Sequence, residues 1–304
     1  MPLIGHTLTK SIKTNAIMKT LQDALSAMDN KGGAADTLRK HLTAAGITKW
    51  KDISKQSLYD FADEVRKTTA PSTTRVIFAR AKVFLNRYSE SCKLPDDWKA
   101  ILAAKTARPV RTFLTTEELG RFEVVPTYKP THEIVKVEAL IEAYTGARIS
   151  DVMNFTEANF SEDGYLTYTS KKTGVTATVP VSEKTKGWIR YAQAHREDEP
   201  GTFGRNYIIR ALAKKAGINE RVKVVTRGKE KEGEKWEFLS SHSFRISAAT
   251  NLTIAGASLY ETMNILGHRD IATTERYVVK TRPQITPKVM AYFLADNTPK
   301  EKEG

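Results

Sequence analysis

Six side chains of the C-terminal half have types and an order suited to attack on a phosphate ester. In chain order they are Arg148, Lys172, His242, Arg245, His268 and Tyr277. A guanidinium holds phosphate oxygens through several planar N–H donors, which the point charge of a lysine does not reproduce. A tyrosine hydroxyl can act as a nucleophile, and a lysine can supply the proton that a leaving oxygen needs. We therefore expect Arg148 and Arg245 to hold a phosphate, with His242 and His268 as further donors.

The spacing around these residues distinguishes them from a chance collection. His242 and Arg245 stand three residues apart in Ser-His-Ser-Phe-Arg, so a helix would present both on one face. This pair alone is weak evidence, because such pairs arise often by chance. It gains weight from Ile-Leu-Gly-His268, which is followed nine residues later by Tyr277. Upstream, Arg148 follows the turn Thr-Gly-Ala, and Asp151 stands three residues beyond it.

With these motifs the sequence resembles the tyrosine recombinase, or phage integrase, family, which includes lambda-type integrases, Xer-type recombinases and Cre. The motifs cover about residues 112–295, and the N-terminal part agrees only in size, helicity and charge. The resemblance implies that Tyr277 attacks a DNA phosphodiester, leaving a 3′-phosphotyrosyl bond and a free 5′-hydroxyl. It implies Lys172 as the general acid, with the adjacent Lys171 as a rival, and Asp151 as a supporting residue. No metal or other cofactor is expected.

The same resemblance implies the partners of the protein. Four protomers would assemble on two double-stranded DNA core sites and exchange strands through a Holliday junction, integrating or excising a mobile element or prophage. A C-terminal helix near residues 286–296 would dock onto a neighbouring subunit, and an accessory DNA-bending or excision factor is a possible further partner. The alternatives are relaxation of DNA in the manner of a type IB topoisomerase and a Xer-type dimer resolvase.

Charge independently suggests a polyanionic partner. The chain has a formal net charge of +13. Residues 1–112 carry 20 Lys and Arg against 10 Asp and Glu, so most of the excess lies in the N-terminal third. Candidate DNA contacts are six basic residues of this region, together with the first of the two hairpin lysines: Lys13, Lys19, Arg75, Arg80, Lys82, Arg87 and Lys171.

Hydrophobic periodicity predicts a mainly helical protein with small β-hairpins, in two domains that form a C-shaped clamp on DNA. Residues 1–95 should form a helical core-binding domain of four helices, including one that begins after an N-cap at Ser54. Residues 96–111 are interpreted as a linker, because the stretch from Pro95 to Arg111 has two prolines and little periodicity. Residues 112–304 should form the mixed α/β catalytic domain.

Two hairpins are predicted in that second domain. Residues 164–181 alternate as strands do, around a turn that carries Lys171, Lys172 and Gly174. A second hairpin is expected at 222–239. Its charged tip, residues 226–236, is either a solvated loop or an added contact to DNA or a partner.

Neither a membrane nor a secretory destination is indicated. No apolar run approaches the roughly 18 residues that a membrane helix needs, and the N-terminus shows no signal-peptide pattern. The single cysteine, Cys92, cannot form an internal disulfide. We expect a cytoplasmic protein that associates with the nucleoid when bound to DNA.

Overall fold

The computed structural model describes residues 20–28, 33–104, 110–226 and 228–279. The chain divides into two compact units, the first formed mainly by residues 1–109 and the second by residues 110–226 and 230–304. Each unit buries a hydrophobic core of its own. Lys13, Lys19 and the expected C-terminal exchange helix lie outside the described residues.

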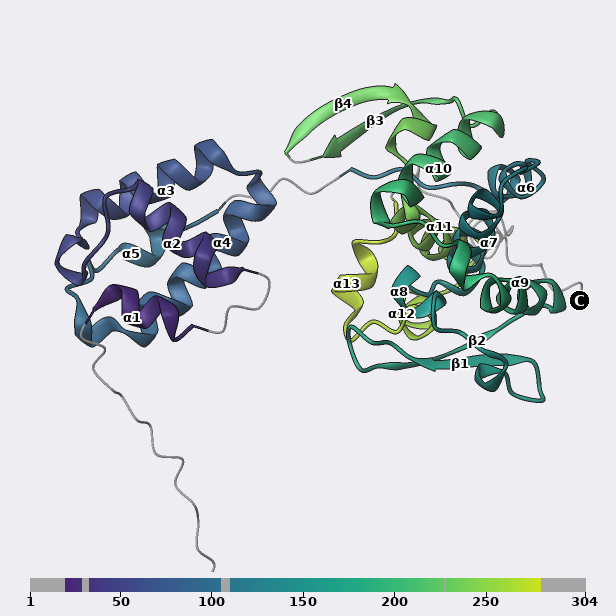
Figure 1. Cartoon of the computed structure of the whole chain (residues 1–304), viewed down its shortest axis with the longest axis horizontal. Helices are drawn as coiled ribbons and strands as arrows, with labels where there is room; N and C mark the ends of the chain where they lie inside the picture. The colour runs from purple at the N-terminus through teal and green to yellow at the C-terminus, as the bar shows by residue number, and fades with distance from the viewer. Residues whose placement is uncertain (1–19, 29–32, 105–109, 227, 280–304) are drawn as a thin grey trace, which may run out of the picture. The chain divides into compact units, whose positions relative to one another are not determined.

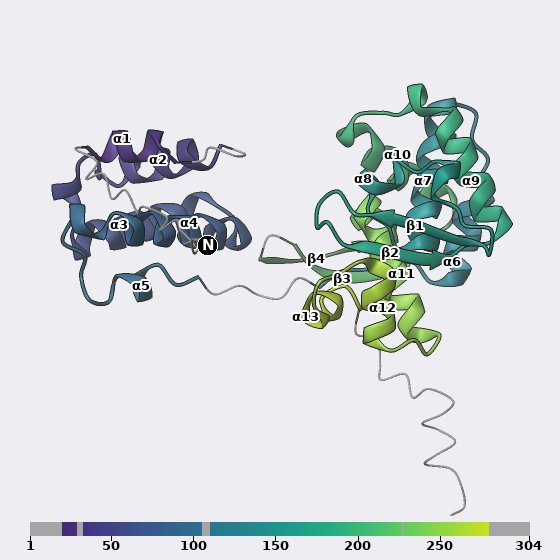
Figure 2. The same cartoon turned by 90° about the horizontal axis from the view of Figure 1, so that it is seen from below.

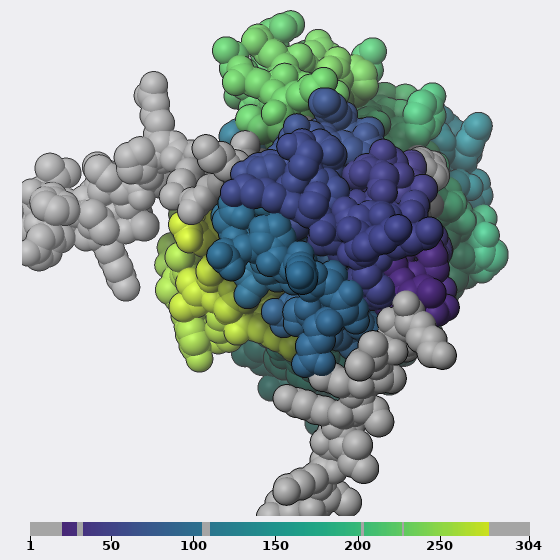
Figure 3. Space-filling model, turned by 90° about the vertical axis from the view of Figure 1, so that its left-hand side faces the viewer, coloured from purple at the N-terminus to yellow at the C-terminus, as the bar shows by residue number. Residues whose placement is uncertain are grey.

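Five α-helices make up the described part of the first unit. They are α1 (Leu21–Ser26), α2 (Ala34–Ala44), α3 (Lys55–Thr68), α4 (Pro71–Arg87) and α5 (Trp98–Ile101). Ser54 caps α3 as expected, since its hydroxyl accepts a hydrogen bond from the Ser57 amide at 3.1 Å. Proline suits the first position of α4 because it lacks the N–H that a helix start leaves unpaired. The helices pack into the continuous purple and blue surface of Figure 3.

The first unit extends into residues 96–111, which were predicted to be a linker. Trp98, Ile101 and Leu102 are buried in the core of the first unit, so the helical unit extends past residue 95. A helix of four residues is too short to show hydrophobic periodicity, which explains why the sequence suggested a linker.

The second unit is built around one buried helix, α7 (Pro130–Thr145). Nearly every residue from Ile134 to Thr145 is buried. Around α7 pack α6 (Thr116–Glu123), α8 (Ile149–Val152), α9 (Glu183–Ala194), α10 (Thr202–Lys215) and α11 (Ser241–Ile254), an arrangement that Figures 1 and 2 show. The chain ends its described part with α12 (Leu259–Leu266) and α13 (Ile271–Glu275). Because α7 is packed against several neighbouring helices, those neighbours fix its position and rotation.

Both predicted hairpins are present. β1 (Tyr165–Thr169) pairs with β2 (Thr176–Pro180) in antiparallel register, and Leu166 lies opposite Val179. Alternate residues of both strands are buried, as the sequence pattern predicted. β3 (Arg221–Thr226) pairs with β4 (Lys229–Glu234). Glu232 of this charged hairpin forms ion pairs with Arg221 and Lys223, so part of its charge is compensated locally.

Two helices of the second unit end at a glycine in the left-handed conformation. Gly146 ends α7 with φ of 69°, a left-handed conformation that glycine adopts at little cost. A Cβ at this position would approach Leu266 Cδ2 to 2.7 Å, so α12 packs directly against the turn. Gly267 ends α12 in the same conformation, with φ of 59°, and directly precedes His268.

The architecture confirms a mainly helical protein with small strand pairs. Among the described residues, the strands form two pairs and the rest of the regular structure is helical. No helix in this part of the chain combines the length and the apolar character required to cross a bilayer.

Candidate active site

Tyr277 lies against three of the predicted residues of the second unit, His242, Arg245 and His268. It follows α13 in a turn, where its amide donates a hydrogen bond to Thr274 O at 2.8 Å. The amide of Val279 donates to Thr250 Oγ1 of α11 at 3.1 Å and so ties the segment to that helix. The Tyr277 ring centroid lies 5.1 Å from that of His242 and 4.7 Å from that of His268.

Arg245 is a fully buried cation beside this ring. Its Cζ lies 5.4 Å from the centroid of the Tyr277 ring, and its side chain is 0% exposed. Nη1 donates to the carbonyl of Gly146, and Nη2 donates to the carbonyl of Leu266 at 2.7 Å and to His268 Nε2 at 2.8 Å. Its Nε has no hydrogen-bond partner among the described residues.

Burial and the nearby charge of Arg148 lower the pKa of Arg245. No ion pair joins Arg245 to a carboxylate within the described ranges. A buried charge without a counter-ion is costly, so this position favours an anionic ligand.

Arg148 is held by a short chain of hydrogen bonds. Its Nη1 donates to Ser170 Oγ at 2.9 Å, and Ser170 Oγ donates to Asp151 Oδ2 at 3.0 Å. Asp151 is itself buried, and its Oδ1 accepts from the Lys171 amide at 3.0 Å. This carboxylate therefore orients Arg148 through the serine and fixes the start of the hairpin turn.

The two lysines of that turn differ in their contacts. Lys171 Nζ donates to Asn154 Oδ1 at 2.7 Å, so its ammonium is directed to the loop after α8. The Lys172 side chain is exposed, and its charge is among those that lower the pKa of His242. The Lys171 ammonium is thus engaged by Asn154, whereas the charge of Lys172 acts on His242.

Both histidines are neutral near pH 7. Burial, followed by the charge of Arg111 and then of Arg245, lowers the pKa of His242 to about 4, although the residue retains an exposed surface. Burial, followed by the charge of Arg245, lowers the pKa of His268 to about 3. Since a guanidinium only donates, His268 Nε2 accepts from Arg245, and its protonated Nδ1 donates to Thr274 Oγ1 at 2.9 Å.

Three residues that contact the predicted catalytic residues were not identified from the sequence. Ser170 links Arg148 to Asp151, and Thr274 orients His268. Arg111, placed in the expected linker, has Cζ 5.9 Å from the Tyr277 ring centroid and Nη1 3.4 Å from His242 Nε2. A hydroxyl or a linker arginine has no sequence pattern of its own, so only the fold identifies these contacts.

The predicted catalytic residues belong to the second unit, whereas four of the candidate DNA contacts belong to the first. Arg75, Arg80, Lys82 and Arg87 all lie on α4 of the first unit, with exposed or half-buried side chains. They form no ion pair with another described residue. They are therefore available to an anionic partner.

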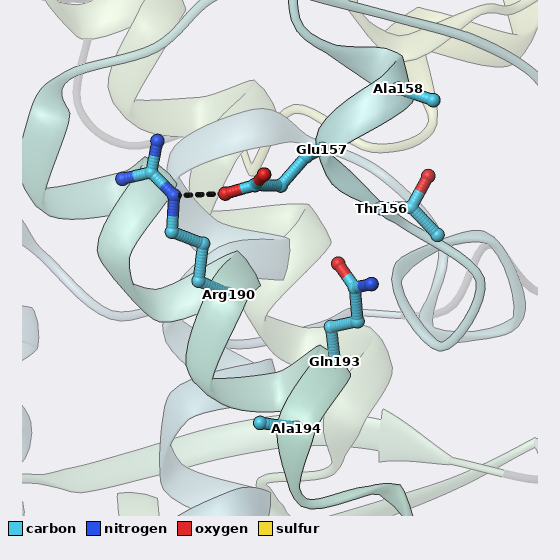
Figure 4. A pocket seen from close by; sticks show the side chains of 6 residues that line it. All are labelled: Thr156, Glu157, Ala158, Arg190, Gln193 and Ala194. Atoms are coloured by element: carbon cyan, nitrogen blue, oxygen red, sulfur yellow. Dashed lines mark hydrogen bonds and ion pairs between the residues drawn. The ribbon is translucent and has the colours of Figure 1, made fainter.

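An open hollow elsewhere on the second unit contains none of the predicted residues. Thr156, Glu157 and Ala158 line it from one side, and α9 lines it from the other. Arg190 Nε donates to Glu157 Oε1 at 2.5 Å across it (Figure 4). Within the described residues there is no group of three or more His, Cys, Asp or Glu side chains arranged to hold a metal ion.

Known proteins match this chain over much of its length. The sequence model described as the phage integrase family matches residues 112–282. Tyrosine recombinase XerD of Chlamydia trachomatis is 26% identical over 276 residues, covering 84% of this chain and 86% of that protein.

Solved structures share the fold. An integrase of the Tn1549 transposon, in complex with transposon right end DNA, has a TM-score of 0.62 at 14% identity, covering 91% of this chain and 99% of that one. A lambda integrase tetramer bound to a Holliday junction has a TM-score of 0.58 at 16% identity, covering 85% and 77%.

Proposed function

Because the chain belongs to the phage integrase family of tyrosine recombinases, we propose that it is a site-specific DNA recombinase whose nucleophile is Tyr277. The observation that carries this proposal is the placement of the Tyr277 ring against His242, His268 and the buried Arg245. A tyrosine packed only for stability would require none of these polar neighbours. Cleavage and rejoining of DNA follow from the family, and the roles of individual residues are our proposal.

The phosphate is held by groups that donate hydrogen bonds without titrating near pH 7. Arg245 and Arg148 contribute guanidinium forks, and both are positioned by hydrogen bonds to the surrounding protein. The unpaired Nε of Arg245 supplies a donor in a buried setting, where electrostatic stabilisation of a developing charge is strongest. His242, whose side chain is partly exposed, donates from the edge of the site.

The chemical step is a transesterification. The Tyr277 oxygen forms a bond to phosphorus while the bond from phosphorus to the 5′ oxygen breaks, leaving a 3′-phosphotyrosyl linkage. The phenol loses one proton and the leaving 5′ oxygen gains one, so the proton count is unchanged. We assign the donated proton to Lys172, because the ammonium of Lys171 is already bound to Asn154. Religation reverses these steps with the 5′-hydroxyl of another strand.

Recognition and assembly extend the same proposal. The basic side chains of α4, with Lys13 and Lys19 before them, bind the DNA backbone. Four protomers then assemble on two core sites, exchange strands through a Holliday junction, and connect through the segment near residues 286–296. The fold shared with a lambda integrase tetramer supports this mode of assembly. Integration or excision of a mobile element is the proposed outcome.

The decisive experiment asks whether product strands come from two different sites. Sites are first selected from a random duplex library as fragments that become covalently attached to the protein. Two plasmids that each carry the selected site are then incubated with the protein. We expect recombinant junctions between the plasmids, and none with Tyr277→Phe. Relaxation of each plasmid without any junction would contradict recombination and indicate a topoisomerase.

A further inference from the structure

A cluster of buried carboxylates lies directly behind the proposed active site. Glu138 and Glu142, one turn apart on α7, are 0% and 1% exposed. Arg205 of α10 forms ion pairs with Glu138 and, at 3.6 Å, with Glu199. The Oε1 atom of Glu138 has no hydrogen-bond partner in the described part of the chain. One guanidinium thus faces more carboxylates than it can neutralise, and the proposed chemistry uses none of them.

Glu142 connects this cluster to the helix that carries two catalytic side chains. Its Oε2 accepts a hydrogen bond from Ser241 Oγ at 2.5 Å. Ser241 is the first residue of α11, directly before His242 and four residues before Arg245. The Ser241 amide is held in turn by Asn206 Oδ1 at 3.1 Å, so the start of α11 is attached to both α7 and α10.

The backbone of Glu142 makes a second connection to the same site. Its carbonyl accepts from the Gly146 amide at 2.9 Å and so closes the last turn of α7. The carbonyl of Gly146 is the one that accepts from Arg245 Nη1. Glu142 therefore contacts the helix that carries Arg245 through its side chain, and supports the turn that holds Arg245 through its backbone.

We propose that Glu142 is a positioning residue of this active site, which holds the start of α11 through Ser241 and thereby sets His242 and Arg245 against the scissile phosphate. The inference rests on the proposed function, since it concerns the same reaction. Glu142 acts in its protonated form. An ionised Glu142 would place a buried negative charge behind Arg245 and weaken the attraction of that guanidinium for phosphate.

The surroundings favour the protonated form of Glu142. Its pKa is raised to about 8, mainly by burial and also by the charge of Glu138, while Ser241, Arg205 and Arg245 act in the opposite direction. Burial also raises the pKa of Glu138 to about 7, against the opposing effect of Arg205. Since a group of pKa 8 changes from roughly 10% to roughly 90% ionised between pH 7 and pH 9, cleavage should fall over that interval.

The test compares wild type, Glu142→Gln and Glu157→Gln in DNA cleavage between pH 6.5 and 9. Glutamine keeps the shape of the side chain and an acceptor for Ser241, but does not ionise. We expect the ratio of the Glu142→Gln rate to the wild-type rate to rise roughly tenfold between pH 7 and 9. Glu157→Gln, which alters an exposed carboxylate, should follow the wild-type profile. A ratio for Glu142→Gln that stays constant within about twofold would overturn the proposal.

A second variant covers the case in which Glu142→Gln does not fold. Ser241→Ala removes the hydrogen bond that lowers the pKa of Glu142. The fall in cleavage should then move to higher pH than in wild type. A fall at the same pH in both proteins would also overturn the proposal.

Thermal unfolding between pH 6 and 8.5 separates this inference from the proposed function. The pKa of Glu142 is higher in the folded protein than in the unfolded chain, so its contribution to stability is lost as pH rises towards 8. We expect the unfolding temperature of wild type to fall relative to that of Glu142→Gln as pH rises over this range. If the unfolding temperatures of the two proteins change in parallel with pH, a protonated Glu142 is contradicted. If wild type forms no covalent DNA complex at any pH, the proposed function fails and the positioning role fails with it. The unfolding curves still decide the protonation of Glu142.

Discussion

Arg245 and His268 form a buried pair in which Nη2 of the arginine donates a hydrogen bond to Nε2 of the imidazole at 2.8 Å. This arrangement requires a neutral imidazole, because a protonated one has no lone pair to accept with. The shift of the His268 pKa to about 3 agrees with that requirement. Both ring nitrogens of His268 are engaged, so the histidine orients Arg245, and Arg245 can present a phosphate with a fixed set of donors at any pH well above 3.

This pair makes stability depend on pH in a specific direction. The pKa of His268 is about 3 in the folded protein and near 6.5 when unfolded, so between these values the unfolded chain binds more protons. Stability should therefore fall as pH is lowered from about 6.5. Urea unfolding at pH 7 and pH 5 measures the loss, which should be smaller in His268→Gln, where glutamine accepts from Arg245 without titrating. An equal loss of stability in wild type and in His268→Gln would contradict the neutral state assigned to His268.

The hydroxyl of Ser170 should matter for catalysis although it does not contact DNA in the proposed mechanism. Ser170→Ala removes the link from Arg148 to Asp151. Loss of a hydrogen bond to a charged group costs about 1.5–3 kcal/mol, so we expect cleavage to slow by roughly 10- to 100-fold. Single-turnover cleavage rates measure this effect.

Thr167→Ala provides the control for Ser170→Ala. The Thr167 hydroxyl forms a hydrogen bond with Thr178 on the exposed face of the same hairpin. The cleavage rate of Thr167→Ala should therefore stay within about twofold of the wild-type rate. If both variants slow equally, the effect belongs to the hairpin and not to the link between Arg148 and Asp151.

Alanine variants of Lys172 and Lys171 should respond differently in a test that identifies the general acid. Lys172→Ala should slow cleavage by about 10²- to 10⁴-fold, the usual contribution of a positioned proton donor. A substrate with sulfur in place of the 5′ oxygen should restore the rate, because a thiolate leaves without being protonated. Lys171→Ala should slow both substrates to a similar, smaller extent, since its ammonium binds Asn154. Selective rescue of Lys171→Ala would reverse the assignment.

A side chain at Gly146 should destabilise the folded protein. Gly146→Ala places a Cβ in a left-handed residue and 2.7 Å from Leu266 Cδ2, whereas Gly164→Ala, with φ of 87°, meets no atom within 4 Å. We expect about 1–2 kcal/mol of destabilisation for Gly164→Ala and about 2–4 kcal/mol for Gly146→Ala. Chemical denaturation gives both values. Equal values would mean that contact with α12 does not constrain the turn.

Much of this site could be predicted because its chemistry is encoded in local motifs. The residues flanking Arg148, Arg245 and Tyr277 form short patterns, and the hairpin strands alternate visibly between exposed and buried positions. Choosing between Lys171 and Lys172 was harder, since adjacent residues of one type differ only in their tertiary contacts. In the structure Lys171 binds Asn154, and this contact supports the proposed assignment of Lys172.

The unpredicted part depends on contacts between distant segments. Glu138 and Glu142 resemble ordinary charged positions of a helix until α9, α10 and α11 enclose α7. Arg111 approaches Tyr277 across more than 160 residues of sequence, in a segment without periodicity. Helix α5 was missed for a different reason, because four residues do not establish a period. Burial of polar groups is a property of the assembled fold, and the sequence pattern does not contain it.

The central claim is that Tyr277 forms the covalent bond to DNA. It is tested most directly with a nicked duplex that carries a cleavage site selected as described above and that loses a short 5′-hydroxyl fragment once cut. The duplex is incubated with the protein without added metal or ATP and analysed on a denaturing protein gel. We expect a shifted protein–DNA band in wild type and none in Tyr277→Phe, which keeps the ring against His242 and His268 but lacks the hydroxyl. A band of equal intensity in Tyr277→Phe would place the nucleophile elsewhere and contradict the proposed active site.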